Sequence, residues 1–397
     1  MREVAQVPQL RFPEFNGEWE EKALGVVATI TTGSTPSTSN NEYYDGDVAF
    51  VSPADIQGNR IVRSTKTTIT ELGLSVVREI KKRSTLFVCI GSTIGKVSQA
   101  GVNCATNQQI NALTAKNSFD NDFIYSLLEF KAPRIKLLAG VQAVPQINKS
   151  EFSRFKFTFP LLPEQQKIAA FLTAVDNKIE QLSKKQELLG EYKKGLMQQI
   201  FSQAIRFKAD DGSEFPDWEE KNGNEIFDNI SNKNHDSDLP ILAITQEHGA
   251  IPRDLINYKM IVSDKSVSSY KVVETGDFII SLRSFQGGIE YSNYKGICSP
   301  AYIILRPAIE IEKKFYKYYL KTYRYIQDLN RKLEGIRDGK MVSYKYFSEI
   351  KLPYPSISEQ AKIANFLSSI DNKIEQVGKQ LDESKQFKKA LLQQMFV

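Results

Sequence analysis

The segment GSTIGKVS, residues 91–98, comes nearest in this sequence to a loop that could hold a nucleotide phosphate. A phosphate-binding loop has four residues between its glycines, and a Ser or Thr after its lysine binds magnesium. Here three residues separate Gly91 from Gly95, and Val97 follows Lys96. The spacing argues against a nucleotide site and predicts a strand–turn–strand that presents Lys96.

Other residues of types that can act in catalysis or bind a metal are present, but they do not form a known catalytic motif. His235 and His248 have no cysteine nearby, so a metal site is not expected. No G-x-S-x-G nucleophile motif occurs, and neither does a glycine-rich cofactor loop with an N/D-P-P-Y/F segment. Acidic pairs such as Asp45 and Asp47 would form a nuclease site only if they converged in space. An enzyme with an unrecognised active site therefore stays open as an alternative.

The composition is that of a globular protein with more than one domain. The 397 residues are 41% hydrophobic and 25% charged, with a net charge of +5. Three scattered cysteines are too few for a disulfide framework. The sequence shows neither the apolar core of a signal peptide nor an apolar run of about 18 residues. We expect a cytoplasmic protein that does not bind membranes.

A long segment occurs twice. Residues 164–201 match 359–396 without a gap at about 20 of 38 positions, 195 residues apart. Apolar residues recur in steps of three and four, which predicts long helices with a coiled-coil seam. Pairing of the two copies, preferably antiparallel, would bury both seams. The seam residues that we expect to pair or to dock a partner are Ile168, Leu172, Val175, Ile179, Leu182, Ile363, Leu367, Ile370, Ile374 and Val377.

Each helix follows a segment of mixed character that differs from its counterpart. Short β-branched and aromatic runs such as TLFVCI at Thr85–Ile90 predict strands, and shorter helices are expected near Phe123–Phe130 and 313–333. We expect an α+β fold in which two heads alternate with two antiparallel helices, with pseudo-twofold symmetry. The expected boundaries are 1–160 and 206–353 for the heads, and 161–205 and 354–397 for the helices.

One stretch of the second head is basic and rich in tyrosine. Residues 313–345 contain about ten Lys or Arg against three acids, interleaved with six tyrosines. Cations neutralise phosphates and tyrosines add stacking area, which favours a nucleic-acid surface. The alternative is a solvated amphipathic helix whose aromatics face the core. A third reading of the whole chain is a coiled-coil adaptor with no nucleic-acid role.

The chain resembles the specificity subunit of type I restriction–modification enzymes over essentially its whole length. The resemblance lies in the repeated motif P-x-x-x-E-Q-x-K-I-A-x-F-L-x-x-x-D-x-K-I from Pro160 and Pro355, the order head–helix–head–helix, and TGSTPST with EYYDGDVAFVSPADI in the first head. TNQQI at Thr106–Ile110 also resembles part of a target recognition domain. The second head has neither a G-x-T-P segment nor a T-N-Q counterpart.

The resemblance implies a sequence-specific subunit without catalytic activity, whose heads each read one half of an asymmetric, bipartite DNA site. It implies double-stranded DNA, two methyltransferase subunits and two nuclease–translocase subunits as partners. S-adenosylmethionine, ATP and magnesium would belong to those partners, and this chain would bind no cofactor or metal. We expect a fixed gap of roughly 5–8 bp, from half-site centres about one DNA turn apart.

Candidate DNA contacts are polar or basic residues of both heads. In the first head, hydroxyls and amides near residues 34–38 and 106–108 could read base edges, with loop capping as the rival role. Gly140 and Gly335 match in register, so the loops that follow them are candidates too. The cations after Gly335 could contact phosphates or be merely solvated. The candidates are Ser34, Thr35, Lys96, Thr106, Asn107, Gln108, Gln142, Arg283, Arg331, Arg337 and Lys340.

Overall fold

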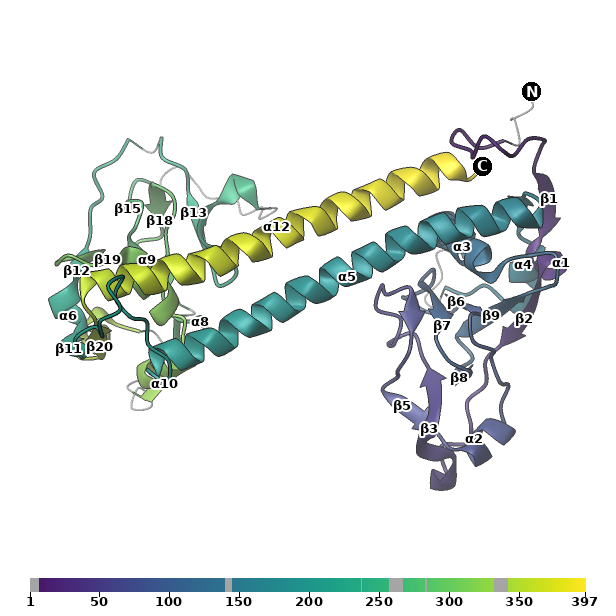
Figure 1. The fold of residues 1–397 in the computed structure, drawn as a ribbon, viewed down its shortest axis with the longest axis horizontal. Coiled ribbons are helices and arrows are strands. Elements are labelled where there is room, and N and C mark those ends of the chain that lie inside the picture. The colour runs from purple at the N-terminus through teal and green to yellow at the C-terminus, as the bar shows by residue number, and fades with distance from the viewer. Residues whose placement is uncertain (1–6, 140–144, 237, 257–266, 283, 332–341) are drawn as a thin grey trace. The chain divides into compact units, whose positions relative to one another are not determined.

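The chain forms two compact units in the computed structural model (Figure 1), which describes residues 7–139, 145–236, 238–256, 267–282, 284–331 and 342–397. The first unit comprises Met1–Lys185 and Val377–Val397, and the second comprises Gln186–Gln376. Each unit therefore contains one head together with parts of both long helices.

The two repeated segments are long helices, as the periodicity predicts. Helix α5 spans Leu162–Phe201 and helix α12 spans Ile357–Met395. In the first unit Lys388 Nζ lies 2.6 Å from Asp176 Oδ1, and in the second Lys193 Nζ lies 2.5 Å from Asp371 Oδ1. Residues early in one helix thus meet residues late in the other, which confirms antiparallel pairing in each unit. The described helices include none that is long and apolar enough to cross a bilayer.

The predicted seam contributes to the head cores as well as to helix pairing. Ile168 and Leu172 share one apolar cluster with Trp19 and Phe123 of the first head, and Leu391 of α12 joins it. Each helix therefore buries part of its apolar stripe against the head that precedes it. The seam residues Ile168, Leu172, Leu182, Ile363, Leu367, Ile370 and Val377 are buried, and Val175, Ile179 and Ile374 are half-buried.

The first head packs helix α3, Asn121–Leu138, against a five-stranded sheet. The sheet order is β2 Ala28–Thr32, β9 Ile110–Ala115, β6 Thr85–Val88, β7 Val97–Ala100 and β4 Ile61–Val62. A second sheet has the order β5 Thr67–Ile69, β3 Tyr44–Val51 and β8 Cys104–Thr106. The remaining elements are β1 Glu20–Ala23, which pairs with β10 Lys156–Phe159, and the short helices α1 Leu24–Val27, η1 Asn41–Tyr43, α2 Glu71–Ser75 and α4 Lys149–Arg154.

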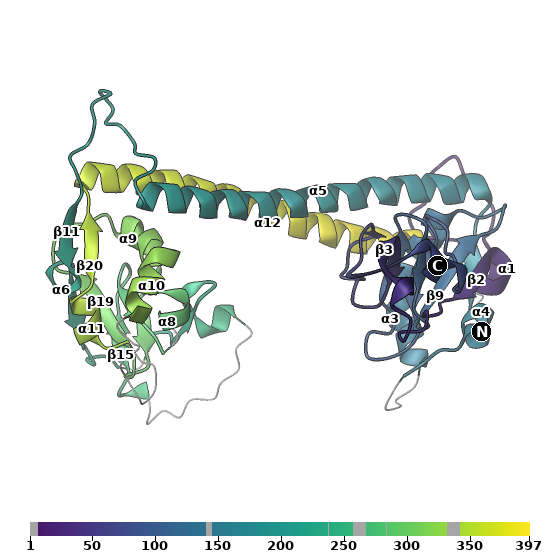
Figure 2. The ribbon, with the colours of Figure 1, turned by 90° about the horizontal axis from the view of Figure 1, so that it is seen from below.

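The second head contains two helices, α9 Lys313–Tyr319 and α10 Tyr323–Arg331, where one helix near 313–333 was expected. Its four-stranded sheet has the order β12 Phe227–Ile230, β19 Ile303–Pro307, β16 Phe278–Ile280 and β17 Glu290–Tyr291. Strand pairs are β11 Glu219–Asn222 with β20 Lys351–Tyr354 (Figure 2), β13 Leu242–Thr245 with β14 Gly249–Pro252, and β15 Lys271–Val273 with β18 Gly296–Cys298. Short helices are α6 Gly223–Ile226, η2 Arg253–Leu255, α8 Ser284–Gly287 and α11 Tyr344–Ser348.

A buried ion pair fastens the start of each long helix, and both copies use matching residues. Arg11 Nη2 lies 2.7 Å from Glu164 Oε2, and Arg206 Nη2 lies 2.9 Å from Glu359 Oε2. The two glutamate side chains are only 4% and 0% exposed. Since both residues of the first pair recur 195 positions later, the repeat encodes a repeated contact.

The glutamine next to each of these glutamates also bonds to the head. We call the ion pair and these glutamine bonds together the joint between head and helix. Gln165 donates through Nε2 to the Pro160 carbonyl at 2.8 Å and accepts through Oε1 from the Asp120 amide at 3.0 Å. Gln360 makes the same bonds, at the same distances, to Pro355 and Glu312. Asp120 and Glu312 are the N-cap residues of α3 and α9. One side chain thus ties the head's helix to the start of the long helix.

The segment that precedes the first head lies beside the end of α12. In the same way, the segment that precedes the second head lies beside the end of α5, which it follows in the chain. The Leu10 amide donates to the Gln394 carbonyl at 2.9 Å. The Ile205 amide donates to the Gln199 carbonyl at 3.3 Å. Leu10 and Ile205 are 195 positions apart, and so are Gln199 and Gln394. The first unit therefore forms, between two distant segments, the same contact that the second unit forms within one continuous stretch of chain.

We expect Arg206→Met to destabilise the chain by about 3 kcal/mol or more, because it leaves the buried Glu359 carboxylate without its cation. The control is Lys221→Met, which removes a 3.2 Å pair with a Glu219 side chain that is 70% exposed. That loss should stay within about 1 kcal/mol. Urea unfolding of the full chain measures both. Equal losses in the two variants would contradict a special role for the buried pair.

Candidate nucleic-acid interface

Two polar loops that are distant in sequence meet in the first head. The segment after β2 runs beside the loop between β8 and β9: the Gly33 amide donates to the Ile110 carbonyl at 3.0 Å, and the Ser34 amide donates to the Thr106 carbonyl at 2.9 Å. Thr35 Oγ1 donates to Gln108 Oε1 at 2.8 Å. Five of the candidate residues therefore form one cluster.

Glycine is required at position 33 for this close approach. A Cβ there would collide with the Asn107 carbonyl and with the hydroxyl and carbonyl of Thr106. Two of these three groups belong to the backbone, so they cannot rotate away. The glycine of the G-x-T-P segment thus sets the distance between the two loops.

Some of the clustered residues are buried or bonded within the loop, and others are exposed. Thr106 is fully buried, and its hydroxyl has no hydrogen-bond partner among the described residues. The Asn107 amide donates to Gln109 Oε1 at 3.0 Å, and its Oδ1 accepts from the Gln109 backbone at 3.1 Å. These contacts fit the loop-capping role for Asn107. Thr35 and Gln108 are exposed and remain the candidates for reading bases.

An arginine that sequence reasoning did not select lies next to this cluster. Arg78 is exposed, and its Nη1 donates to the Thr32 carbonyl at 2.7 Å, directly before the Gly33 segment. Tyr44 holds the far side of the segment, because its hydroxyl donates to the Pro36 carbonyl at 2.7 Å. Arg78 follows α2 in a stretch without a motif, so only the fold brings it there. We call Thr35, Arg78 and Gln108 the first-head polar cluster.

Lys96 lies in the predicted strand–turn–strand. Strands β6 and β7 flank the turn, and Gly91 and Gly95 adopt φ of 92° and 91°, which favour glycine. The ammonium of Lys96 is half-buried and donates to the Pro53 carbonyl at 3.2 Å. The interpretation against a phosphate-binding loop is supported, since a strand follows where such a loop would begin a helix.

In the second head, the tyrosine-rich stretch mostly builds the core. Tyr316, Tyr318, Tyr319 and Tyr325 are 0–6% exposed, and burial raises the pKa of Tyr319 to about 12. The core-facing alternative thus holds for these four rings, whereas Tyr323 is 70% exposed. Arg331 ends α10 with a 77% exposed side chain that pairs with Asp328 at 3.4 Å. Gln142, Arg283, Arg337 and Lys340, like Gly140 and Gly335, lie outside the described residues.

The described part of the chain brings together no three His, Cys, Asp or Glu side chains that could hold a metal ion. Burial raises the pKa of each of Cys89, Cys104 and Cys298 to about 12. These thiols therefore stay protonated at neutral pH, and a thiol is a poor nucleophile and metal ligand compared with a thiolate.

The family model of the type I restriction modification DNA specificity domain matches residues 16–189 and 216–384. The chain belongs to this family. Each match spans one head and most of the helix that follows it. The unit of the family is therefore a head with its helix, and this chain contains two such units.

Relatives of known type agree with the family assignment. The chain is 25% identical to the type I restriction enzyme MjaVIII specificity subunit of Methanocaldococcus jannaschii, over 96% of this chain and 92% of that one. It is 29% identical to the type I restriction enzyme HindI specificity subunit of Haemophilus influenzae, over 41% of this chain and 37% of that one. The solved type I S subunit from M. genitalium shares the fold, with a TM-score of 0.63, 19% identity and coverage of 98% and 99%.

We expect Gly33→Ala to destabilise the first head by about 1–3 kcal/mol, the usual cost of overpacking. The matched control is Gly195→Ala in α5, where an added Cβ meets nothing within 4 Å. Because alanine is the better helix former, this control should gain up to about 1 kcal/mol. Denaturant unfolding gives both values. A neutral Gly33→Ala would show that the two loops do not require their close approach.

Proposed function

We propose that this chain is the DNA-reading subunit of a type I restriction–modification complex, and that its two heads read the two halves of an asymmetric, bipartite site. The observation that carries the proposal is a repeated joint that holds unlike heads. Arg11 with Glu164, and Arg206 with Glu359, form the same two-bonded ion pair at the two joints. Beyond the joints the main sheets share an equivalent strand order, β2-β9-β6-β7 and β12-β19-β16-β17, but the remaining strands differ: the first head adds β4 and the sheet β5-β3-β8, and the second has the pairs β13-β14 and β15-β18.

The first-head polar cluster supplies groups suited to base edges and phosphates. A glutamine amide can bond bidentately to adenine, and an arginine to guanine or to a phosphate. Thr35 Oγ1 donates to Oε1 of the Gln108 amide, which restricts the orientation of that side chain. A fixed amide reads sequence better than a mobile one, because less side-chain entropy is lost on binding.

The test of bipartite reading is an exchange of one head. Residues 1–155 are replaced by the first head of a related family member, and methylated motifs are determined by sequencing the modified bases in cells. One half-site should change, while the other half and the gap stay as they were. A change in both halves, or methylation of a continuous motif from the start, would overturn the proposal.

A second arm of the same experiment addresses the spacer. One heptad inserted after Lys185 lengthens α5 while keeping the periodicity of its apolar stripe. We expect a changed gap between unchanged half-sites, or loss of function if a partner loses its register. Unchanged half-sites with an unchanged gap would show that the helices do not set the spacing.

The partners follow from the same duplication. We propose that the helices dock two methyltransferase subunits, that nuclease–translocase subunits complete the assembly in the cytoplasm, and that this chain itself catalyses no reaction. S-adenosylmethionine, ATP and magnesium would then be bound by those partners. The support lies in two exposed aromatics at matching positions: Tyr192 of α5 is 56% exposed and Phe387 of α12 is 54% exposed. Exposed aromatics are typical anchors of protein interfaces.

We expect Tyr192→Ala and Phe387→Ala each to weaken the docking of one methyltransferase subunit, by about tenfold or more for an anchor residue. Native mass spectrometry of the co-expressed complex should show a shift from two bound subunits toward one, and the double variant should retain little of either. Tyr294→Ala, at an exposed tyrosine of the second head, is the control and should leave two subunits bound. Full occupancy in the double variant would reject these anchors.

A further inference from the structure

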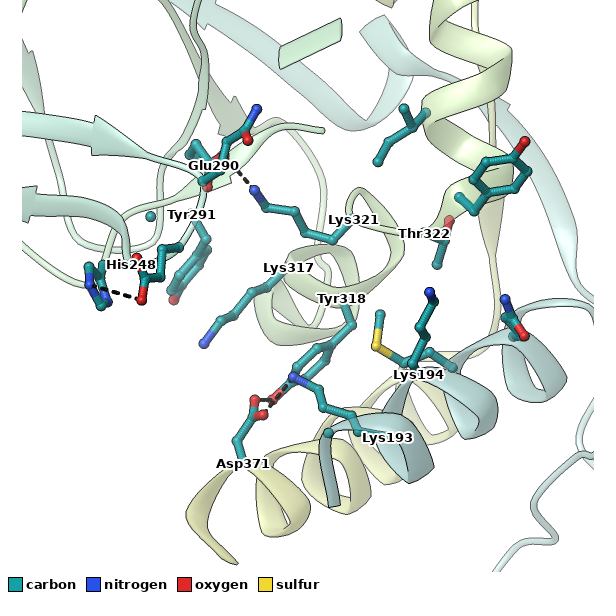
Figure 3. A pocket seen from close by; sticks show the side chains of 18 of the residues that line it. Lys193, Lys194, His248, Glu290, Tyr291, Lys317, Tyr318, Lys321, Thr322 and Asp371 are labelled. Atoms are coloured by element: carbon teal, nitrogen blue, oxygen red, sulfur yellow. Dashed lines mark hydrogen bonds and ion pairs between the residues drawn. The ribbon is translucent and has the colours of Figure 1, made fainter. Parts of the chain in front are cut away.

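A cavity of about 730 Å³ lies within the second unit, between the C-terminal half of α5 and the second head (Figure 3). Cavities of 300–1,000 Å³ are typical of small-molecule sites. Its walls come from α5, from α9 and the residues after it, from the β13–β14 turn and from β17, with Asp371 of α12 at one side. The residues that matter below are Lys193, Lys194, Lys317, Lys321, Tyr291 and Tyr323.

The lining carries more positive charge than its acids neutralise. Four lysines line the cavity, against the acids Glu247, Glu290 and Asp371. Lys193 pairs with Asp371 at 2.5 Å, and Lys321 pairs with Glu290. Glu247 lies 3.8 Å from His248 at the edge. Once the two lysine–carboxylate pairs are set aside, the ammonium groups of Lys194 and Lys317 remain against the carboxylate of Glu247, so four lysines and three acids leave the lining with one net positive charge when His248 is neutral.

Lys317 is the more unusual of the two. Its side chain is half-buried, and its ammonium lies 5.7 Å from the ring centres of both Tyr291 and Tyr318. Burial lowers the pKa of Lys317, Asp371 opposes this, and Lys193 and Lys314 lower it further. Ring faces attract a cation but accept none of its three N–H donors as a carboxylate would. Among the described residues it forms no hydrogen bond or ion pair.

In the first unit, a tyrosine beneath an arginine stands at the position that matches Lys317. Tyr125 and Lys317 both stand five residues after the N-caps, Asp120 and Glu312, that the matching glutamines hold. Over the ring of Tyr125 lies the guanidinium of Arg60, 4.8 Å from its centre and 8% exposed. Arg60 also pairs with Asp176 and Asp122, at 2.9 Å each.

The two units therefore differ in the partners of the carboxylate that the repeat places in both. In the first, the repeated carboxylate Asp176 pairs with both Lys388 and Arg60. In the second, the repeated carboxylate Asp371 receives Lys193 and the hydroxyl of Tyr318 at 2.7 Å. Where the first unit places an aromatic ring under an arginine, the second places a lysine beside an open cavity.

We propose that this cavity binds a phosphate group, held by the ammonium groups of Lys317 and Lys194 with Tyr291 and Tyr323 at its sides. The two ammonium groups can each bond a phosphate oxygen, and the net positive charge of the lining attracts both a phosphate monoester, at about −1.5 to −2 at neutral pH, and a singly charged backbone phosphodiester. Lysine is a common phosphate ligand, and it acts as a point charge. The phosphate belongs either to a free nucleotide, whose base the tyrosines can stack, or to the backbone of bound DNA.

The experiment compares Lys317→Gln with Lys314→Gln in the full chain. Lys314 is exposed on the same helix and does not line the cavity, so both variants remove one charge from α9. Calorimetric titration with inorganic phosphate and with AMP tests the free-ligand source. The salt dependence of DNA binding tests the backbone source. The phosphate arm requires no DNA, so failure of the proposed DNA-reading function would leave it measurable.

For a free-nucleotide site, Lys317→Gln should weaken AMP and phosphate binding by roughly tenfold or more. For a DNA-backbone site, the slope of log K against log salt should fall by about one. Lys317→Arg should retain most of the effect, and Lys314→Gln should resemble the wild type. If Lys317→Gln changes neither binding nor slope, or if Lys314→Gln changes them equally, the site does not exist. Should Lys317→Gln not fold, Lys194→Gln at the exposed rim tests the same cavity with the same two readouts.

Discussion

A glutamate buried at the start of each long helix, with an arginine beside it, is the contact on which the rest of the structure depends. A carboxylate in the first turn of a helix also faces the positive end of the helix dipole. Glu164 and Glu359 thus satisfy two demands at once, but their burial makes the arginine partner indispensable. The neighbouring glutamines then fix the head's own helix to this point.

This arrangement explains why the repeat is conserved between two copies while the heads differ. The joint is polar, buried and geometrically demanding, so the residues that form it must be the same wherever it is made. A head needs only to present an N-capped helix and one strand pair at the joint, as β1–β10 and β11–β20 do. Beyond that boundary both heads keep an equivalent four-stranded order, β2-β9-β6-β7 and β12-β19-β16-β17, and they are free to differ in their remaining strands and loops, as they do.

The same freedom changes the charge of the surface between head and helix. Arg60 reaches from the first head to Thr173 and Asp176 of α5, and Arg63 pairs with Glu180 at 2.8 Å. The first head is therefore linked to its helix by direct ionic contacts. In the second unit the corresponding space is a cavity with lysines in its wall. The two units thus share one scaffold but differ in the contacts between head and helix.

Much of the architecture could be predicted because it depends on local and periodic features. The period of 195 residues indicated two equivalent units, and the spacing of apolar residues indicated two long helices that pair. Both follow from burial of a continuous apolar stripe, which the order of residue types states directly. Residues of the TGSTP segment and of TNQQI were each candidates for DNA contacts, but the contact between the two segments was not predicted, because it comes from the sheet.

Other properties were decided by tertiary structure alone. Thr106 looks like an available hydroxyl in the sequence, yet it ends β8, an outer strand of a three-stranded sheet, and is completely buried there. Four tyrosines of a basic stretch face inward, because α9 and α10 pack against the C-terminal part of α5 as well as their own head. Arg78 reaches the polar cluster, and Lys317 reaches an open cavity, through distances in space that no local pattern records. Sequence by itself determined that one long helix is used twice and that each copy follows a head; only the fold decided which polar side chains are buried and which stay exposed, because burial depends on neighbours that are far apart in the chain.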